Sequence, residues 1–227
     1  MSLPDFFSAA PDTHRIFFMR HGESEGNAGG ILQGRSNYPL TPLGKRQAEA
    51  AAGWFIDQSI DLVLSSPQTR ARATADIVSR TIRERGQLTA FAALDGLSEV
   101  DLGCFTGLTM DEAQQRHPEI HRRVQYETWD AVPDAEHSET LRERAIQIWK
   151  TIIDRLSEHR NVLVVSHGGF LQWLIKAGMG ADHSRWNLRI HSSNCGIHEC
   201  NVMRRSDDHV VVEWRRINMV VAPPEGA

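Results

Sequence analysis

The feature that most constrains the fold of this chain is a short apolar run that ends in a charged triplet. The run from Ile16 to Met19 has the composition of a buried strand, and Arg20, His21 and Gly22 follow it directly. Arg20 offers a planar fork of donors that suits a phosphate or a carboxylate. His21 can act as a nucleophile near neutral pH, and Gly22 lets an anion approach the backbone. Taken alone, the pattern is equally compatible with an anion site and with a strand end whose Arg is solvated.

Two later segments repeat this design. Residues 161–169 place His167 and two glycines after an apolar run, and residues 61–70 form a third run whose end delivers Arg70 in the first turn of a helix. Open α/β sheets bind ligands beyond the carboxyl ends of their strands, so we expect the three ends to converge. The resulting pocket would hold two histidines and two arginines.

Five blocks of the sequence resemble the histidine phosphatase superfamily, which has the phosphoglycerate-mutase-like fold. They cover most of residues 15–175 in the order of the family, which makes the resemblance highly specific. The blocks are Arg20-His21-Gly22-Glu23, Gln33-Gly34 with Pro39-Leu40-Thr41-Pro42-Leu43-Gly44, Ser65-Ser66-Pro67 with Arg70-Ala71, Glu99 with Gly103 and Gly107, and Ser166-His167-Gly168-Gly169. The expected fold is a three-layer α/β/α arrangement, with a mostly parallel mixed central sheet, helices on both faces and a small lid insertion.

The resemblance implies phosphoryl transfer through a covalent phosphohistidine. The two histidine strand ends look alike, and the family assignment makes His21 the nucleophile. Glu99 corresponds to the proton-donating carboxylate of the family, although Asp101 lies close by and spacing alone does not choose between them. The positions that match substrate contacts of the family are Arg20, Asn27, Gln33, Gly34, Arg70, His167 and Gly168. Because two guanidinium groups and a second histidine supply positive charge, we expect neither a metal nor a cofactor.

Two positions depart from the family pattern. Asn37 stands where relatives commonly have Asp, and residues 134–137 read Asp-Ala-Glu-His where many of the phosphatases have Gly-Gly-Glu-Ser. Both changes leave the catalytic groups in place, so they bear on substrate preference more than on the reaction.

A phosphatase is the favoured member of the family, because Glu99 runs straight into residues 100–107 without the long insertion of the mutase branch. A short lid would let water reach a phosphohistidine. A cofactor-dependent phosphoglycerate mutase is the alternative enzyme. A catalytically inactive phosphate-binding or scaffold module is the alternative of another class, since a fold can outlive its activity.

We expect one domain over residues 15–219, because 227 residues suffice for a single α/β core. Residues 1–14 and 220–227 are interpreted as loose tails. Residues 108–135, which contain two prolines, are interpreted as the lid insertion. Its basic residues either meet the substrate or, more commonly for such runs, form a solvated helix face; they are Arg116, His117, His121, Arg122 and Arg123.

Helix and strand signals support this organisation. Thr41 with Pro42 is typical of a helix start, and Ser66 with Pro67 repeats that signal. Apolar residues recur at helical spacing after each of these starts and again from about residue 138 to residue 157. Alternating apolar and polar residues over 196–203 and 210–217 predict a β-hairpin at the edge of the sheet.

Composition limits the partners of the chain. A net charge of -4, with 25 Lys and Arg against 29 Asp and Glu, argues against a general nucleic-acid or membrane-surface binder. No apolar run approaches the length of a membrane span, and the N-terminus does not resemble a signal peptide. Three scattered cysteines, Cys104, Cys195 and Cys200, do not make a disulfide framework. We therefore expect a soluble, cytoplasmic monomer or homodimer that acts on a small phosphorylated substrate.

Two other site types were considered. His191, Cys195, His198 and Cys200 suggest zinc, but their spacing fits no common zinc pattern, and Cys195 and His198 would face opposite sides of a strand. A Gly-Lys-Ser or Gly-Lys-Thr phosphate loop is missing from the sequence, which argues against an NTPase.

Overall fold

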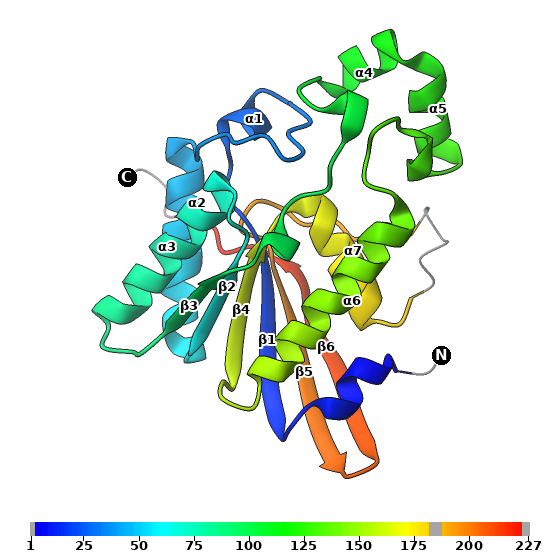
Figure 1. Cartoon of the computed structure of the whole chain (residues 1–227). Coiled ribbons are helices and arrows are strands. Elements are labelled where there is room, and N and C mark those ends of the chain that lie inside the picture. Colours follow the sequence, from blue (N-terminus) through cyan, green and yellow to red (C-terminus); the bar gives the residue numbers. More distant parts are fainter. Residues whose placement is uncertain (1–2, 182–187, 224–227) are drawn as a thin grey trace.

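The structure, a computed structural model, describes residues 3–181 and 188–223 and is built on a six-stranded sheet (Figure 1). The strand order is β3-β2-β4-β1-β5-β6. The strands are β1 (Thr13–Arg20), β2 (Leu62–Ser65), β3 (Ala90–Ala93), β4 (Asn161–Ser166), β5 (Ile197–Ser206) and β6 (His209–Met219). The first four strands in this order run parallel to one another. β5 pairs antiparallel with β1, and β6 pairs antiparallel with β5. The predicted mostly parallel mixed sheet is confirmed.

The register of the parallel strands aligns their carboxyl ends. Arg20 at the end of β1 pairs with Ser166 at the end of β4, and Ser65 at the end of β2 pairs with Val165. The residues that follow these three strands therefore lie along one edge of the sheet, which is the top of Figure 1. This alignment brings the three strand ends together, as expected.

Helices cover both faces of the sheet. The two pairs are α2 (Pro42–Phe55) with α3 (Thr69–Glu84), and α6 (Ser138–Arg155) with α7 (Gly168–Gly178). Alternate residues of β1 serve the two layers: Phe17 and Met19 belong to the core under α2 and α3, whereas Ile16 and Phe18 belong to the core under α6 and α7. The three-layer prediction is thus confirmed. The short elements are α1 (Glu25–Ala28), α4 (Met110–Arg116), α5 (Pro118–Tyr126), η1 (Asp5–Ala9), η2 (Ile56–Gln58), η3 (Asp95–Leu97), η4 (Gly103–Phe105) and η5 (Trp129–Ala131).

The two predicted helix starts differ in outcome. The Thr41 side chain caps α2 by accepting from Gly44 N–H, with Pro42 in the first turn, as predicted. The prediction that Ser66 and Pro67 start α3 is wrong, because that helix begins at Thr69. The side chain of Asn37, from a distant loop, accepts from Thr69 N–H at 3.1 Å and so serves as the cap. Asp would accept the same bond, which explains why Asn is tolerated here.

The N-terminal segment is not the loose tail that was expected for residues 1–14. From Asp5 onward it folds into η1, and β1 begins at Thr13. Phe7 is fully buried against Trp149, with ring centroids 5.0 Å apart, and Phe6 stacks on the same ring. Two adjacent aromatic side chains bury enough surface to hold the segment on α6. At the other end, β6 stops at Met219. Residues 220–223 of the predicted tail over 220–227 form no helix or strand, and residues 224–227 lie outside the described residues.

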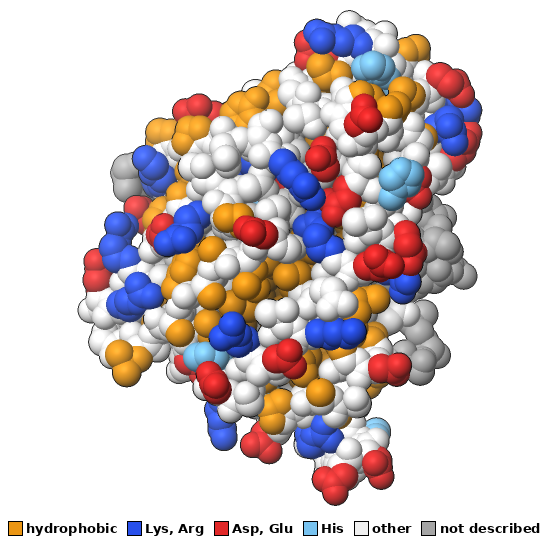
Figure 2. Space-filling view, viewed as in Figure 1, with side chains coloured by type: hydrophobic (Ala, Val, Ile, Leu, Met, Phe, Trp, Pro, Cys, Tyr) orange, Lys and Arg blue, Asp and Glu red, His pale blue; other side chains and the backbone are white. Residues whose placement is uncertain are grey.

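The segment that was predicted to be a lid, residues 108–135, contains α4, α5 and η5 and lies above the carboxyl edge of the sheet (Figure 1). Its arginines pair with acidic neighbours, Arg116 with Glu112, and both Arg122 and Arg123 with Glu127. Figure 2 shows the same mixture of positive and negative side chains over this part of the surface. The interpretation as a solvated helix face therefore fits these arginines.

The C-terminal hairpin has the predicted form, and β6 is an edge strand of the sheet. His198 on β5 lies with Nε2 2.8 Å from Ser192 Oγ, and its Nδ1 accepts from Asn218 N–H. Cys195 and Cys200 are buried free thiols. Within the described part of the chain, no helix has both the length and the apolar character that a bilayer span requires.

Candidate active site

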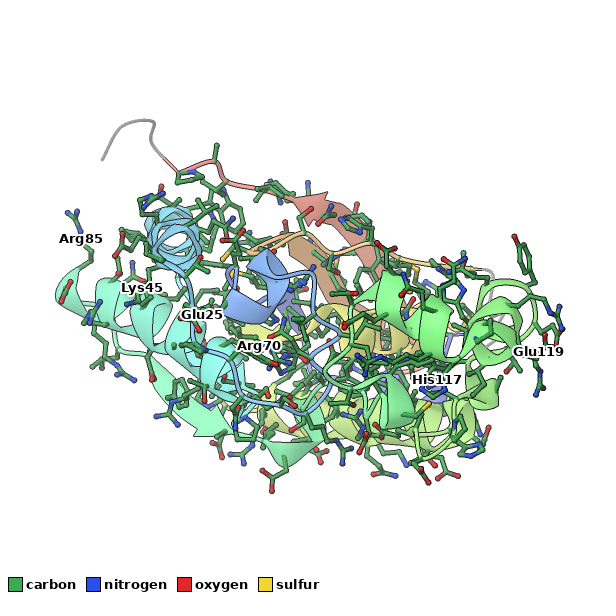
Figure 3. All side chains as sticks on the ribbon, turned by 90° about the horizontal axis from the view of Figure 1, so that it is seen from above. Glu25, Lys45, Arg70, Arg85, His117 and Glu119 are labelled. Carbon is green, nitrogen blue, oxygen red and sulfur yellow. The ribbon has the colours of Figure 1, made fainter. Side chains whose placement is uncertain are left out.

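The structure brings together the four side chains that the strand ends predicted. The ring centroids of His21 and His167 are 5.2 Å apart, and Arg70 bonds directly to His21. His21, Arg70 and His167 are each at most 2% exposed, and Arg20 lies beside them at the end of β1. Figure 3, viewed from above this edge, shows Arg70 directed from α3 to the middle of the molecule, whereas Glu119 of the lid projects outward.

The hydrogen bonds of His21 determine its tautomer. Its Nδ1 lies 2.6 Å from the carbonyl oxygen of Gly22, an obligate acceptor, so the proton is on Nδ1. Its Nε2 accepts a hydrogen bond from Arg70 Nε at 3.1 Å and therefore carries the lone pair. Burial, with the nearby charges of Arg20 and Arg70, holds the pKa of His21 well below its usual value. His21 is consequently a neutral imidazole with its lone pair in the pocket.

Arg70 is anchored through all three of its guanidinium nitrogens. Besides the bond to His21, Nη1 donates to Ser36 O at 2.7 Å and Nη2 donates to Gly34 O at 2.9 Å. Burial lowers the pKa of Arg70 to about 10, with Glu99 opposing and Arg20 adding to the shift. The guanidinium remains charged at neutral pH in a fixed orientation.

Two buried nitrogens at this edge, Arg20 Nε and His167 Nδ1, have no hydrogen-bond partner among the described residues. Arg20 Nη1 donates to Ser192 O at 2.9 Å, and His167 Nε2 lies 2.8 Å from Ser66 Oγ. Burial, then the proximity of His21, Arg70 and Arg20, holds the pKa of His167 well below its usual value. Buried polar groups are normally satisfied. Both nitrogens are therefore candidates for contact with a bound ligand.

Asn27 is oriented so that its amide hydrogens stay available. Its Oδ1 accepts from Ser24 N–H at 3.2 Å, from Ser24 Oγ at 2.9 Å and from Asn194 Nδ2 at 3.2 Å. Asn194 also donates to His21 O at 3.0 Å, so it joins the Asn27 loop to the end of β1. We did not single out Asn194 from the sequence, because the pairing spans 167 residues and leaves no local pattern.

Gln33 and Gly34 support the pocket from behind. Gln33 is buried, and its Oε1 accepts from Ser24 Oγ. Gly34 has a φ of +48°, and its carbonyl oxygen accepts from Arg70 and from Gln68 Nε2. Gln68 Oε1 in turn accepts from Glu99 N–H at 2.7 Å. Gln68, which was not predicted from the sequence, therefore connects the loop at Gly34 to the candidate acid Glu99.

Glu99, and not Asp101, faces the pocket. The carboxylate of Glu99 accepts from Gly169 N–H at 3.1 Å and from Phe170 N–H at 2.8 Å, at the N-terminus of α7. Glu99 lines a pocket of about 360 Å³ together with Arg20 and Gly168. Asp101 instead accepts from Gly103 N–H in its own turn.

The segment that departs from the family pattern still holds the Glu99 loop in place. Glu136 forms a bidentate pair with Arg144, at 2.8 and 2.7 Å. Nη1 of Arg144 donates to the carbonyls of Gly96 and Ser98, immediately before Glu99. The retained glutamate therefore has a structural partner, and the neighbouring His137 lies 4.0 Å from Asp130.

The chain is similar to known proteins in both sequence and structure. The family model of the histidine phosphatase superfamily (branch 1) matches residues 16–216. A 2-carboxy-D-arabinitol-1-phosphatase of Triticum aestivum is 32% identical over 82% of this chain and 36% of its own length. The solved structure of Bacillus stearothermophilus YhfR has a TM-score of 0.73 at 25% identity, covering 82% of this chain and 90% of that one. The mycobacterial glucosyl-3-phosphoglycerate phosphatase Rv2419c shares the fold, with a TM-score of 0.79 at 22% identity over 90% and 99% of the two chains.

Fold and site together define an α/β protein with two histidines and two arginines gathered at the carboxyl edge of its sheet. The chain belongs to the histidine phosphatase superfamily. It spans less than half the length of two curated plant relatives, at 41% and 36%. The relatives that are named as phosphatases are consistent with a phosphoric monoester hydrolase.

Proposed function

We propose that this protein hydrolyses phosphate monoesters through a phosphohistidine on His21, without a metal ion. The observation that carries the proposal is the state of His21: a buried, neutral imidazole whose Nε2 accepts from the Arg70 guanidinium, with the charge of Arg20 nearby. The wheat and mycobacterial relatives are named for the hydrolysis of a phosphate ester, which supports the same class of reaction.

In the first step, Nε2 of His21 attacks phosphorus and the ester P–O bond breaks. Arg20, Arg70, Asn27 and His167 hold the phosphoryl oxygens, and the Nε–H of Arg70 turns from the imidazole to one of these oxygens. Protonated Glu99 gives its proton to the departing alcohol oxygen.

In the second step, water attacks the phosphohistidine. Glu99, now a carboxylate, takes a proton from this water, the P–N bond breaks, and the electron pair returns to Nε2 of His21. Inorganic phosphate leaves and the enzyme regains its starting protonation state.

Positive charge from the protein substitutes for a metal in this scheme. Arg70 and Arg20 remain cationic at neutral pH, and they are fixed by hydrogen bonds to backbone carbonyls of Gly34 and Ser192. Among the described residues, no group of three or more His, Cys, Asp or Glu side chains is arranged to hold a metal ion. Turnover should therefore persist in EDTA, and a loss that Mg²⁺ or Zn²⁺ restores would contradict the metal-free mechanism.

Three free cysteines fit a reducing compartment, so we place the protein in the cytoplasm.

Rapid quench with a ³²P-labelled monoester tests the intermediate. We expect an acid-labile, base-stable phosphoprotein that His21→Ala abolishes. Label that survives in His21→Ala but disappears in His167→Ala would reverse the roles of the two histidines. Binding of inorganic phosphate without any turnover of a monoester panel would instead support the inactive binding module.

A further inference from the structure

A second, apolar pocket adjoins the candidate active site. It has a volume of about 170 Å³ and is lined by Val100, Leu102, Trp129, Gly169, Gln172 and Trp173. Gly169 and Gln172 also line the larger pocket that contains Arg20 and Glu99, so the two spaces are neighbours across these residues.

We propose that the apolar pocket binds the alcohol part of the substrate, and that this alcohol carries a compact hydrocarbon group such as a single six-membered ring. The proposal rests on the proposed function, because it assumes that Glu99 protonates the leaving oxygen. It adds the chemical class of the leaving group, which neither the phosphate contacts nor the catalytic groups specify.

The position of Glu99 directs the leaving group to this pocket. A general acid must lie within hydrogen-bond reach of the oxygen that it protonates. The Glu99 carboxylate is fixed by the Gly169 and Phe170 amides, and the next residue in the chain, Val100, is already part of the apolar wall. The carbon attached to the leaving oxygen therefore emerges beside Gly169 and Gln172, at the boundary between the two pockets.

The size and lining of the pocket select the group that enters. Its volume suits a single six-membered ring, since an apolar cavity of about 150 Å³ is large enough to bind benzene. Val100, Trp129 and Trp173 are at most 8% exposed, and Gln172 supplies the one polar side chain among the six lining residues. A polyhydroxylated alcohol would leave several hydroxyls without partners there, which is costly. A ring or a branched alkyl group has no hydrogen bonds to lose when it enters the pocket.

The wall of the pocket is pre-organised. Nε1 of Trp129 donates to the carbonyl oxygen of Glu136 at 2.9 Å, and Glu136 is held by its bidentate pair with Arg144. The tryptophan therefore does not have to be ordered when a ligand binds, which lowers the entropic cost of recognition.

The test compares benzyl phosphate with methyl phosphate, whose leaving alcohols have similar acidity, so that the difference in kcat/KM reports the ring and not the chemistry. Burial of one ring should favour benzyl phosphate by about 10- to 100-fold. Leu102→Trp, which fills the pocket from a half-buried position, should reduce this preference about tenfold. Leu88→Trp, at a side chain that is 94% exposed, should leave the preference unchanged.

Binding of the non-hydrolysable analogues benzylphosphonate and methylphosphonate keeps the two proposals separate. Tighter binding of the benzyl compound without turnover of either ester would refute the proposed function and support the apolar subsite. Turnover of both esters with equal kcat/KM and equal phosphonate affinity would overturn the subsite and leave the hydrolase intact. A preference for glycerol 1-phosphate over benzyl phosphate would also overturn it. If Leu102→Trp fails to fold, the wild-type comparison of the two phosphonates still decides.

Discussion

Arg70 Nε donates a hydrogen bond to Nε2 of His21 across 3.1 Å, so the arginine occupies the lone pair of the proposed nucleophile before substrate arrives. The same guanidinium is held by the carbonyls of Ser36 and Gly34. This contact keeps the imidazole in one tautomer and one orientation. In the proposed mechanism, a small shift of the guanidinium group redirects this donor to a phosphoryl oxygen.

Arg70→Lys should therefore lower kcat/KM by about 100-fold or more, although it preserves the charge. A lysine ammonium cannot reproduce a planar fork that bonds two carbonyls and an imidazole at once. Steady-state kinetics with an alkyl phosphate measure the effect. Arg80→Lys, at an exposed ion pair on the same helix, is the matched control and should retain activity. Comparable activity in Arg70→Lys and wild type would show that charge alone suffices.

Glu99→Gln should slow hydrolysis of an alkyl phosphate by about 10²- to 10⁴-fold, because a poor leaving group needs a proton. The same variant should lose far less activity on 4-nitrophenyl phosphate, whose leaving group departs as an anion. Asp101→Asn is the control, since Asp101 caps its own turn. Equal losses on both substrates in Glu99→Gln would indicate a structural role, and a larger effect in Asp101→Asn would make Asp101 the acid.

Asn194 is a positioning residue for Asn27 on the geometry described above. Asn194→Ala and Asn27→Ala should each weaken competitive inhibition by vanadate about tenfold, and the double variant should be little worse than either single one. Asn161→Ala, which removes an amide at the far end of β4, should alter stability but not vanadate affinity. Additive losses of vanadate affinity in the double variant would show that Asn194 does not act through Asn27.

The free energy of unfolding should fall as the pH drops below about 6.5. Burial lowers the pKa of His198 to about 4, and it also lowers the pKa values of His21 and His167, whereas an unfolded histidine titrates near 6.5. Between these values the unfolded chain binds more protons than the folded chain, so acid favours unfolding. Each histidine contributes about 1.4 kcal/mol per pH unit within its window.

Urea unfolding at pH 7.5 and pH 5.5 measures this dependence. His198→Gln should reduce the difference in unfolding free energy between the two pH values by about 1 kcal/mol. A wild-type protein equally stable at both values would contradict the lowered pKa values of all three histidines.

A phosphoglycerate supplied with the bisphosphoglycerate primer should release inorganic phosphate faster than its isomers interconvert. A mutase must exclude water from the phosphohistidine. The segment that we propose as the lid contains two short helices, α4 (Met110–Arg116) and α5 (Pro118–Tyr126). Coupled assays for phosphate and for the second isomer measure the two rates. Efficient isomerisation with little phosphate release would make the protein a mutase.

Elements whose signals are local could be predicted from the sequence. The apolar run before Arg20 and the Thr41-Pro42 start of α2 mark a strand and a helix through residues only a few positions apart. The carboxyl-edge convergence of His21 and His167 also followed, because parallel strands must end at one edge of a sheet.

The side chains that support the site could be identified only in the folded protein. Asn37 caps α3 across 32 residues, and Gln68 bonds Glu99 across 31 residues, at separations that no periodicity encodes. The donor to Nε2 of His21 is Arg70, 49 residues away. The apolar pocket needs Val100 from the Glu99 loop, Trp129 from the lid and Trp173 from α7 in one place. Such contacts arise from the packing of distant segments, so spacing along the chain cannot specify them.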